Sequence, residues 1–255
     1  MGVVNVTPDS FSDGGLYFAR DAALAHAREL AAEGAQIIDI GGESTRPGAA
    51  PVPQDEELAR ILPVLEGLGD LCVSVDTRRP PVMEAALDAG ASMINDVQAL
   101  QTPGALDAVR DAQCAVCLMH MKGEPANMQR DPHYDDVVRE VRDFLRQRVA
   151  AAEAAGIARE RIVVDPGFGF GKTAAHNLTL LKRLAEFGEL GVPRMAGLSR
   201  KSTIGKLTGR AAGERLAGGL AMALIALQGG ATILRVHDVK ETRDVIAVWQ
   251  AVRSA

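Results

Sequence analysis

The sequence predicts an α/β protein in which eight parallel strands close into one (β/α)8 barrel, a TIM barrel. Eight short apolar runs alternate with longer amphipathic stretches along the 255 residues, which is typical of a parallel sheet covered by helices. The length suits one such barrel. Polar side chains follow the apolar runs, at what would be the carboxyl ends of the strands, where barrels build their sites.

An open, doubly wound sheet is the alternative architecture. Such a sheet would more often carry a dinucleotide-binding fingerprint after an early strand, and this sequence has none there. No linker rich in Pro, Gly or Ser divides the chain, so we expect a single domain over residues 1–255.

The first half of the chain supplies four strand–helix units. Strands are predicted from short apolar, β-branched runs at residues 2–6, 35–40, 71–75 and 92–94. Helices are predicted from apolar residues three and four apart at residues 20–33, 54–68, 81–89 and 104–111. Pro81 fits the first turn of the third helix, because its missing N–H would have no partner there.

The second half supplies four more units. Strands are predicted at residues 115–119, 162–164, 194–197 and 232–235, and helices at residues 135–155, 176–187, 213–228 and 239–252. Turns from helix to strand are plain, as in Ala89-Gly90-Ala91, whereas the strand ends are polar. This asymmetry predicts one site assembled from the loops at one end of the barrel.

Composition and charge exclude several classes of function. The net charge of −5 offers no basic surface for nucleic acid or anionic membrane, and no apolar run is long enough to cross a membrane. The N-terminus has no secretion signal, and three cysteines fit a reducing compartment, so we expect a cytoplasmic protein. Cys114 and Cys117 lie on a predicted strand and should face opposite sides, which excludes a shared metal or disulfide.

The glycine-rich stretch from Asp165 to Lys172 follows a predicted strand and precedes a helix. It is not a P-loop, because proline stands at position 166, where that motif needs its first glycine. It is not a dinucleotide-binding loop either, because Lys172 stands where the last glycine belongs. Another role must explain an acid at a strand end before three alternating glycines.

The chemistry of the strand ends indicates a flat, nitrogen-rich ligand with an anionic group. Asp76, Asn95 and Asp165 can accept from ring N–H and amino groups. Arg200 and Lys201 can supply cationic donors for a carbonyl or an anion. Positive charge from two further loops comes from Arg46, Arg235 and His237. The loops at residues 7–15 and 41–48, rich in Gly, Pro, Ser and Asp, are expected to close over the substrate.

Together these motifs closely resemble those of the bacterial dihydropteroate synthases, a pterin-binding family. The matching stretches are residues 5–15, 41–48, 75–77, 94–96, 119–121, 165–172, 199–202 and 235–239, in the family's order and across nearly the whole chain. The resemblance implies a barrel that joins 4-aminobenzoate to 6-hydroxymethyl-7,8-dihydropterin diphosphate. It also implies an SN1-like reaction, in which pyrophosphate leaves, a pterin methylene cation forms and the amine attacks it.

The resemblance also implies roles for particular residues. The pterin would be bound by Asp76, Asn95, Asp165, Lys201, Met119, Phe170 and Gly197. The diphosphate would be bound by Asn5, Thr45, Arg46, Arg235 and His237, with Asn5 near a magnesium ion. The 4-aminobenzoate, and competing sulfonamides, would contact Phe11, Thr45, Pro47, Gly169, Phe170, Lys201 and Ser202. Catalysis would depend on Lys201, Arg235, His237 and Asp76, and the protein would be a homodimer.

Several polar residues near the predicted site have competing interpretations. Asp39 either joins the site or only braces the second loop, and Asp96 is expected to brace its own loop. His120 is expected beside the site without contacting the ligand. The histidines at positions 26, 133 and 176 are expected on the surface.

Two other functions stay open at this stage. One is a corrinoid-linked methyltransferase barrel that binds a methylated folate, although it does not need Arg235, His237 or the two long loops. The other is a non-catalytic pterin-binding protein, which would tolerate the loss of Asn5 or Thr45. The resembled enzymes usually carry a segment before the first strand that covers the barrel floor, and this segment is expected to be absent here.

Overall fold

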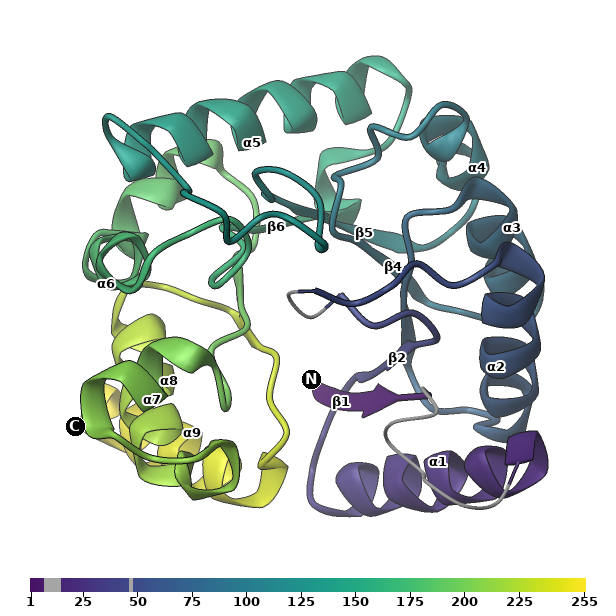
Figure 1. Cartoon of the computed structure of the whole chain (residues 1–255), viewed down its shortest axis with the longest axis horizontal. Coiled ribbons are helices and arrows are strands. Elements are labelled where there is room, and N and C mark those ends of the chain that lie inside the picture. Colours follow the sequence, from purple (N-terminus) through teal and green to yellow (C-terminus); the bar gives the residue numbers. More distant parts are fainter. Residues whose placement is uncertain (7–14, 46–47) are drawn as a thin grey trace.

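The computed structural model describes residues 1–6, 15–45 and 48–255, and within them the strands form a closed ring surrounded by helices (Figure 1). Six strands pair in parallel in chain order: β1 (Gly2–Asn5), β2 (Ile38–Gly41), β3 (Val73–Asp76), β4 (Met93–Asp96), β5 (Ala115–Met119) and β6 (Ile162–Asp165). The last two, β7 (Met195–Ala196) and β8 (Ile233–Leu234), pair with each other. Single bridges from Val164 to Arg194 and from Gly2 to Val236 close the ring. The predicted (β/α)8 barrel is confirmed.

Helices follow the strands around the outside of the ring. They are α1 (Gly15–Ala32), α2 (Gln54–Gly67), α3 (Pro80–Asp88), α4 (Ala105–Arg110), α5 (Val137–Ala154), α6 (Ala174–Lys182), α7 (Ser202–Thr208), α8 (Leu216–Gln228) and α9 (Val239–Ser254). Short 3₁₀ segments lie at η2 (Arg159–Arg161), η3 (Leu184–Leu190) and η4 (Ala212–Glu214). No helix in the described part of the chain is long and apolar enough to span a membrane.

Two helix predictions were wrong in detail. The helix expected at residues 176–187 ends at Lys182, and its remainder is the 3₁₀ segment η3. The helix α7 was not predicted, because Ser, Thr and a central Gly205 hide its apolar period. The guanidinium of Arg215 lies against Gly205, in the space that a side chain at this position would take.

Side chains point alternately to the two faces of each strand, so the strands separate an outer core from an inner one. Outward-facing residues such as Ile40, Val75 and Ile94 join the large core under the helices. Inward-facing Met93, Cys117, Val163 and Met195 form a small apolar cluster inside the barrel. Cys114 belongs to the outer core and Cys117 to the inner one, so the prediction that they face opposite sides is confirmed.

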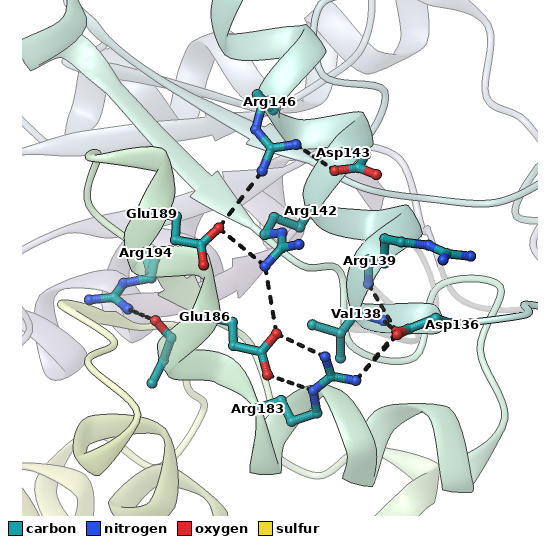
Figure 2. A network of polar contacts seen from close by, with 11 residues as sticks. Asp136, Val138, Arg139, Arg142, Asp143, Arg146, Arg183, Glu186, Glu189 and Arg194 are labelled. Atoms are coloured by element: carbon teal, nitrogen blue, oxygen red, sulfur yellow. Dashed lines mark hydrogen bonds and ion pairs between the residues drawn. The ribbon is translucent and has the colours of Figure 1, made fainter.

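A network of charged residues joins α5 to the segment that follows α6, on the outside of the barrel (Figure 2). Arg142 lies 3.2 Å from Glu189 and 3.6 Å from Glu186, measured between Nη1 and the nearer carboxylate oxygen. Arg183 pairs with Glu186 at 2.6 Å and with Asp136 at 3.4 Å. Asp136 also caps α5 by accepting from the backbone of Val138 and Arg139. Solvent screens exposed pairs of this kind, so each contributes little to the stability of the fold.

Candidate functional site

The inward positions nearest the carboxyl ends of the strands form a polar layer above the apolar cluster. In-register pairing places Asn5 beside Gly41, Gly41 beside Asp76, and Asp76 beside Asn95. On the other side, Met119 pairs with Asp165. Because residues two apart on a strand share a face, Asn95 lies directly above Met93 and Asp165 above Val163, so the apolar cluster is the base of the site.

Arg235, directly after β8, links two of the carboxylates in this layer. Its Nε donates to Oδ2 of Asp39 at 2.6 Å, and its Nη2 donates to Oδ2 of Asp76 at 3.0 Å. Asn95 also donates to Asp39, with 3.5 Å between Nδ2 and Oδ2. The interpretation of Asp39 as a brace for the second loop was therefore wrong, because its bonds run across the barrel interior to Arg235 and Asn95.

Burial and neighbouring charges shift the protonation of this group. Burial raises the pKa of Asp76 to about 7; Arg235 opposes the shift, and Asp39 and Asp96 add to it. Burial alone would lower the pKa of Arg235, but Asp39 and Asp76 raise it above its ordinary value. Arg235 therefore stays charged, while Asp76 can change its charge near neutral pH.

Several buried oxygens in the described interior have no partner. They are Oδ1 of Asp39, Oγ of Ser74 and Oδ1 of Asn95. Such atoms normally find a hydrogen bond from water or ligand. The three lie on the adjacent strands β2, β3 and β4, so this side of the barrel can accept N–H groups from a ligand.

Asp165 and Lys201 face each other across the other side of the layer. Oδ1 of Asp165 accepts from the backbone N–H of Gly167 at 2.7 Å. Burial raises the pKa of Asp165, while Lys201 is the strongest influence lowering it. The Nζ of Lys201 donates to the carbonyl of Phe168 and lies 4.7 Å from the centre of the Phe170 ring. Burial lowers the pKa of Lys201 to about 8, against the attraction of Asp165.

Two glycines keep this corner open. A Cβ at Gly197 would lie 4.0 Å from Oδ2 of Asp165 and 3.8 Å from Cβ of Arg235. A Cβ at Gly169 would lie 3.3 Å from the Lys201 side chain, and the φ of +86° also favours glycine. A larger residue at either position would crowd the carboxylate or the lysine.

The loops after β7 and β8 are joined by two contacts. Oγ of Ser199 lies 3.1 Å from Nδ1 of His237 and accepts from the His237 backbone N–H at 3.3 Å. Arg200 forms an ion pair with Asp238, in which Nε donates at 3.2 Å. The prediction that Arg200 supplies a donor to the ligand was wrong, because Asp238 engages its guanidinium. Ser199 was not predicted to orient His237.

The base of the loop after β2 is anchored by two arginines from the loop after β3. Glu43 lies 3.5 Å from Arg78 and 3.1 Å from Arg79. Arg79 also donates to the carbonyl of Val52 at 2.6 Å and pairs with the buried Glu57. Thr45 lies half-buried in this loop, next to the anchored base. The predicted site residues Phe11, Arg46 and Pro47 lie outside the described residues.

Three further predictions concern residues around the site. Asp96 accepts from the backbone of Gln98 and Leu100 at 2.8 and 2.7 Å, so its role as a loop brace is confirmed. His120 is buried, and burial lowers its pKa to about 2. His176 is half-buried and closes a capping box with Thr173, so the prediction of a plain surface position was wrong.

Within the described residues, no group of three His, Cys, Asp or Glu side chains could hold a metal ion. Asn5 faces the interior beside Gly41 and offers an amide oxygen. Magnesium commonly takes one or two protein oxygens and completes its shell with water and substrate phosphates. The donor set therefore fits a magnesium ion that arrives with a phosphate ligand.

Comparisons with known proteins agree with this site. Residues 1–237 match the family described as "Pterin binding enzyme". The dihydropteroate synthase of Escherichia coli (strain K12) is 50% identical over 258 residues, covering 100% of this chain and 92% of that protein. The solved dihydropteroate synthase of Xanthomonas albilineans with 4-aminobenzoic acid superimposes with a TM-score of 0.95, at 58% identity, covering 100% of this chain and 93% of that one. The Yersinia pestis enzyme in a sulfonamide complex gives a TM-score of 0.95 at 49% identity, with 100% and 94% coverage.

Proposed function

This chain belongs to the family of pterin-binding enzymes, and we propose that it catalyses the dihydropteroate synthase reaction of folate biosynthesis. In this reaction 6-hydroxymethyl-7,8-dihydropterin diphosphate and 4-aminobenzoate give 7,8-dihydropteroate and pyrophosphate. The observation that carries the proposal is the polar layer in which Asp76, Asn95 and Asp165 surround the barrel interior, with Oδ1 of Asn95 lacking a partner among the described residues.

The pterin is assigned to this layer. Its ring N–H and amino groups match the acceptors of Asp76, Asn95 and Asp165, and its carbonyl matches the ammonium of Lys201. Met119 and Phe170 supply apolar surface for the flat ring, and Gly197 leaves space beside Asp165. A ligand without these donors would leave the carboxylates unpaired, at a cost of about 1–3 kcal/mol for each group.

The diphosphate is assigned to the side of the barrel where β8 and β1 meet. Arg235 and His237 are two residues apart after β8, and Asn5 ends β1. Thr45 and Arg46 would complete this subsite from the second loop. Arg235 already contacts Asp76, so it lies between the pterin acids and the leaving group.

Magnesium would be held by Asn5 together with phosphate oxygens and water. When bound, the ion neutralises charge on the departing pyrophosphate. Because Asn5 is the single protein ligand in this proposal, magnesium affinity would depend on the substrate.

The 4-aminobenzoate is assigned to the open side of the pterin, next to Phe170. Gly169, Phe170, Lys201 and Ser202 would line this position, which the contact between Lys201 and the Phe170 ring supports, and Phe11, Thr45 and Pro47 would approach from the two long loops. A sulfonamide would compete here, as expected from its resemblance to 4-aminobenzoate in shape and charge.

The mechanism needs no nucleophile from the protein. The C–O bond to the diphosphate breaks, and Arg235 and His237 stabilise the charge that develops on the leaving group. The buried carboxylates of Asp76 and Asp165 stabilise the pterin methylene cation. The amine of 4-aminobenzoate then forms the new C–N bond and loses a proton. The walls of the barrel limit water, which would otherwise consume the cation.

We also propose that the protein is a homodimer that packs through α8 and α9. Leu216 and Ile225 on α8 are 38% and 44% exposed, and Val248 and Val252 on α9 are 65% and 72% exposed. Exposed apolar side chains gathered on neighbouring helices are typical of an interface between subunits. The three free cysteines support the proposal that the protein works in the cytoplasm.

The direct test is to incubate the purified protein with the pterin diphosphate, 4-aminobenzoate and magnesium, and to detect dihydropteroate by mass spectrometry. Product formation that ceases when 4-aminobenzoate is omitted is expected. A folded protein that binds the pterin and yields no dihydropteroate would contradict the proposed reaction.

A further inference from the structure

Lys172 is a buried lysine that the mechanism does not use. Lys172 is 2% exposed, and its Nζ lies between the loop after β6 and the loop after β5. Nζ donates to the carbonyl oxygens of Gly167 and Phe170 at 2.9 Å each, and to that of His120 at 3.3 Å. It also lies 2.9 Å from Nδ1 of His120. One amino group therefore connects two loops through four contacts.

Two opposing influences act on the charge of this amino group. Burial lowers the pKa of Lys172 well below its ordinary value and Lys201 and Lys122 add to this lowering, whereas the carboxylate of Asp165 opposes it. The three carbonyl oxygens are acceptors, and Nδ1 of neutral His120 is an acceptor in one tautomer. An ammonium offers three N–H groups to them and a neutral amine only two, so protonation satisfies more of these buried atoms.

The two loops that Lys172 joins are packed backbone to backbone. Gly167 and Gly171 have φ values of +70° and +62°. A Cβ on Gly167 would overlap the carbonyl oxygen of His120, and a Cβ on Gly171 would overlap that of Lys122. The backbone N–H of His120 also donates to the carbonyl of Asp165 at 3.0 Å. Tyr134 and Gln129 also donate from the loop after β5 to the carbonyls of Gly171 and Gly169, but among the described residues Lys172 is the only one whose side chain donates to the carbonyls of Gly167 and Phe170.

Lys172 acts on the same backbone that positions two site residues. The N–H of Gly167 orients the carboxylate of Asp165, while the carbonyl of Gly167 accepts from Lys172. The carbonyl of Phe170 accepts from Lys172, while its ring lies under Lys201. A change in this loop would therefore move both the carboxylate and the ring.

We propose that Lys172 is a positioning residue of the site: its buried amino group fixes the loop after β6 against the loop after β5 and so holds Asp165 and Phe170 in the geometry that receives the pterin. The choice of ligand rests on the function proposed above. The positioning itself rests on the contacts of Lys172 alone.

The test compares Lys172→Met with Lys182→Met, which removes an exposed lysine from α6. Binding of the pterin diphosphate, with magnesium and without 4-aminobenzoate, is measured by calorimetry. Lys172→Met is expected to weaken binding by about tenfold to a hundredfold, because Gly167 and Phe170 lose a buried donor. Lys182→Met should bind like the unmodified protein. Affinity within twofold of the unmodified protein, or a lower melting temperature with unchanged affinity, would overturn the proposal.

A second pair of variants covers the case in which Lys172→Met does not fold. His120→Asn keeps an acceptor near the position of Nδ1, and His120→Leu removes it. The proposal expects weaker pterin binding for His120→Leu and near-normal binding for His120→Asn. Equal binding by the two variants contradicts it.

A third readout does not depend on any ligand. Hydrogen exchange of the Gly167 and Phe170 amides should be faster in Lys172→Met than in Lys182→Met, and equal rates overturn the proposal. A protein that makes no dihydropteroate but shows this difference would refute the proposed reaction and leave the positioning role intact.

Discussion

The Nε of Arg235 donates to Oδ2 of Asp39 at 2.6 Å, and this bond crosses the barrel interior from β8 to β2. Asp39 is fully buried, and Arg235 also contacts Asp76. A single guanidinium thus compensates two carboxylates in the polar layer above the apolar cluster.

Removing one partner of this group should destabilise the fold. Asp39→Ala leaves Arg235 with one buried carboxylate partner fewer, and we expect the free energy of unfolding to fall by about 3 kcal/mol. Urea denaturation measures this loss. Asp39→Asn keeps an acceptor oxygen and should lose less. Similar losses for both variants would show that the charge, rather than the hydrogen bond, carries the stabilisation.

Activity should depend on pH through Asp76 and Lys201. In the proposed function the ionised form of Asp76 accepts from the pterin, so kcat/KM for the pterin should rise as pH increases through about 7. The protonated form of Lys201 would donate to the pterin, so kcat/KM should fall above about 8. The expected plot of kcat/KM against pH is a narrow bell. Asp76→Asn should be much less active, and its kcat/KM should not rise with pH near 7. A rise that persists near pH 7 in this variant would show that another group causes it.

The carboxyl of Asp76 should also make the free energy of unfolding depend on pH, and this contribution should fall where the activity rises. The folded pKa of Asp76, about 7, lies above its ordinary value of 3.8, so the folded protein binds the extra proton between these pH values. This contribution is present below about pH 4 and is lost as pH rises towards 7. Urea midpoints of the unmodified protein and Asp76→Asn, compared across this range, measure it. A difference that does not change with pH would contradict the shift.

Ser199 should influence catalysis through His237. Ser199→Ala removes the hydroxyl 3.1 Å from Nδ1, so His237 loses one of the contacts that would orient it towards the proposed diphosphate site. We expect kcat to fall about twofold to tenfold, which corresponds to one hydrogen bond, with little change in the KM for 4-aminobenzoate. Ser254→Ala, at the exposed end of α9, is the control. Equal kinetics for the two variants would remove Ser199 from the site.

Gly167 and Gly209 form a matched pair for the packing of the loop after β6. Both have left-handed backbone, with φ of +70° and +72°, but no atom lies within 4 Å of a Cβ placed on Gly209. Gly209→Ala should lower the free energy of unfolding by about 1 kcal/mol, the cost of the conformation alone. Gly167→Ala should cost on the order of 2 kcal/mol more, because its methyl group meets the carbonyl of His120. Equal losses in thermal unfolding would mean that the two loops separate easily.

The sequence predicted the barrel and the acids of the site for a simple physical reason. Several short apolar runs end in a polar residue that the period of two places on the inner face, as for Asp76 and Asp165. Contacts between distant loops could not be predicted in this way. Arg200 and Asp238 are 38 residues apart, and their pairing depends on how β7 and β8 lie side by side. Lys172 follows a glycine-rich loop, a context in which lysine is normally exposed, so its burial could not be predicted from the residues around it.

The two single bridges that close the barrel have a mechanical consequence. β7 and β8 form a two-stranded sheet, which is joined by one bridge to each end of the six-stranded sheet. The six-stranded sheet carries Asp76, Asn95 and Asp165. The loops that follow β7 and β8 carry Lys201, Arg235 and His237. The positively charged side chains of the proposed site therefore follow β7 and β8, so a shift of these two strands along the bridges would move them relative to the acids proposed to bind the pterin.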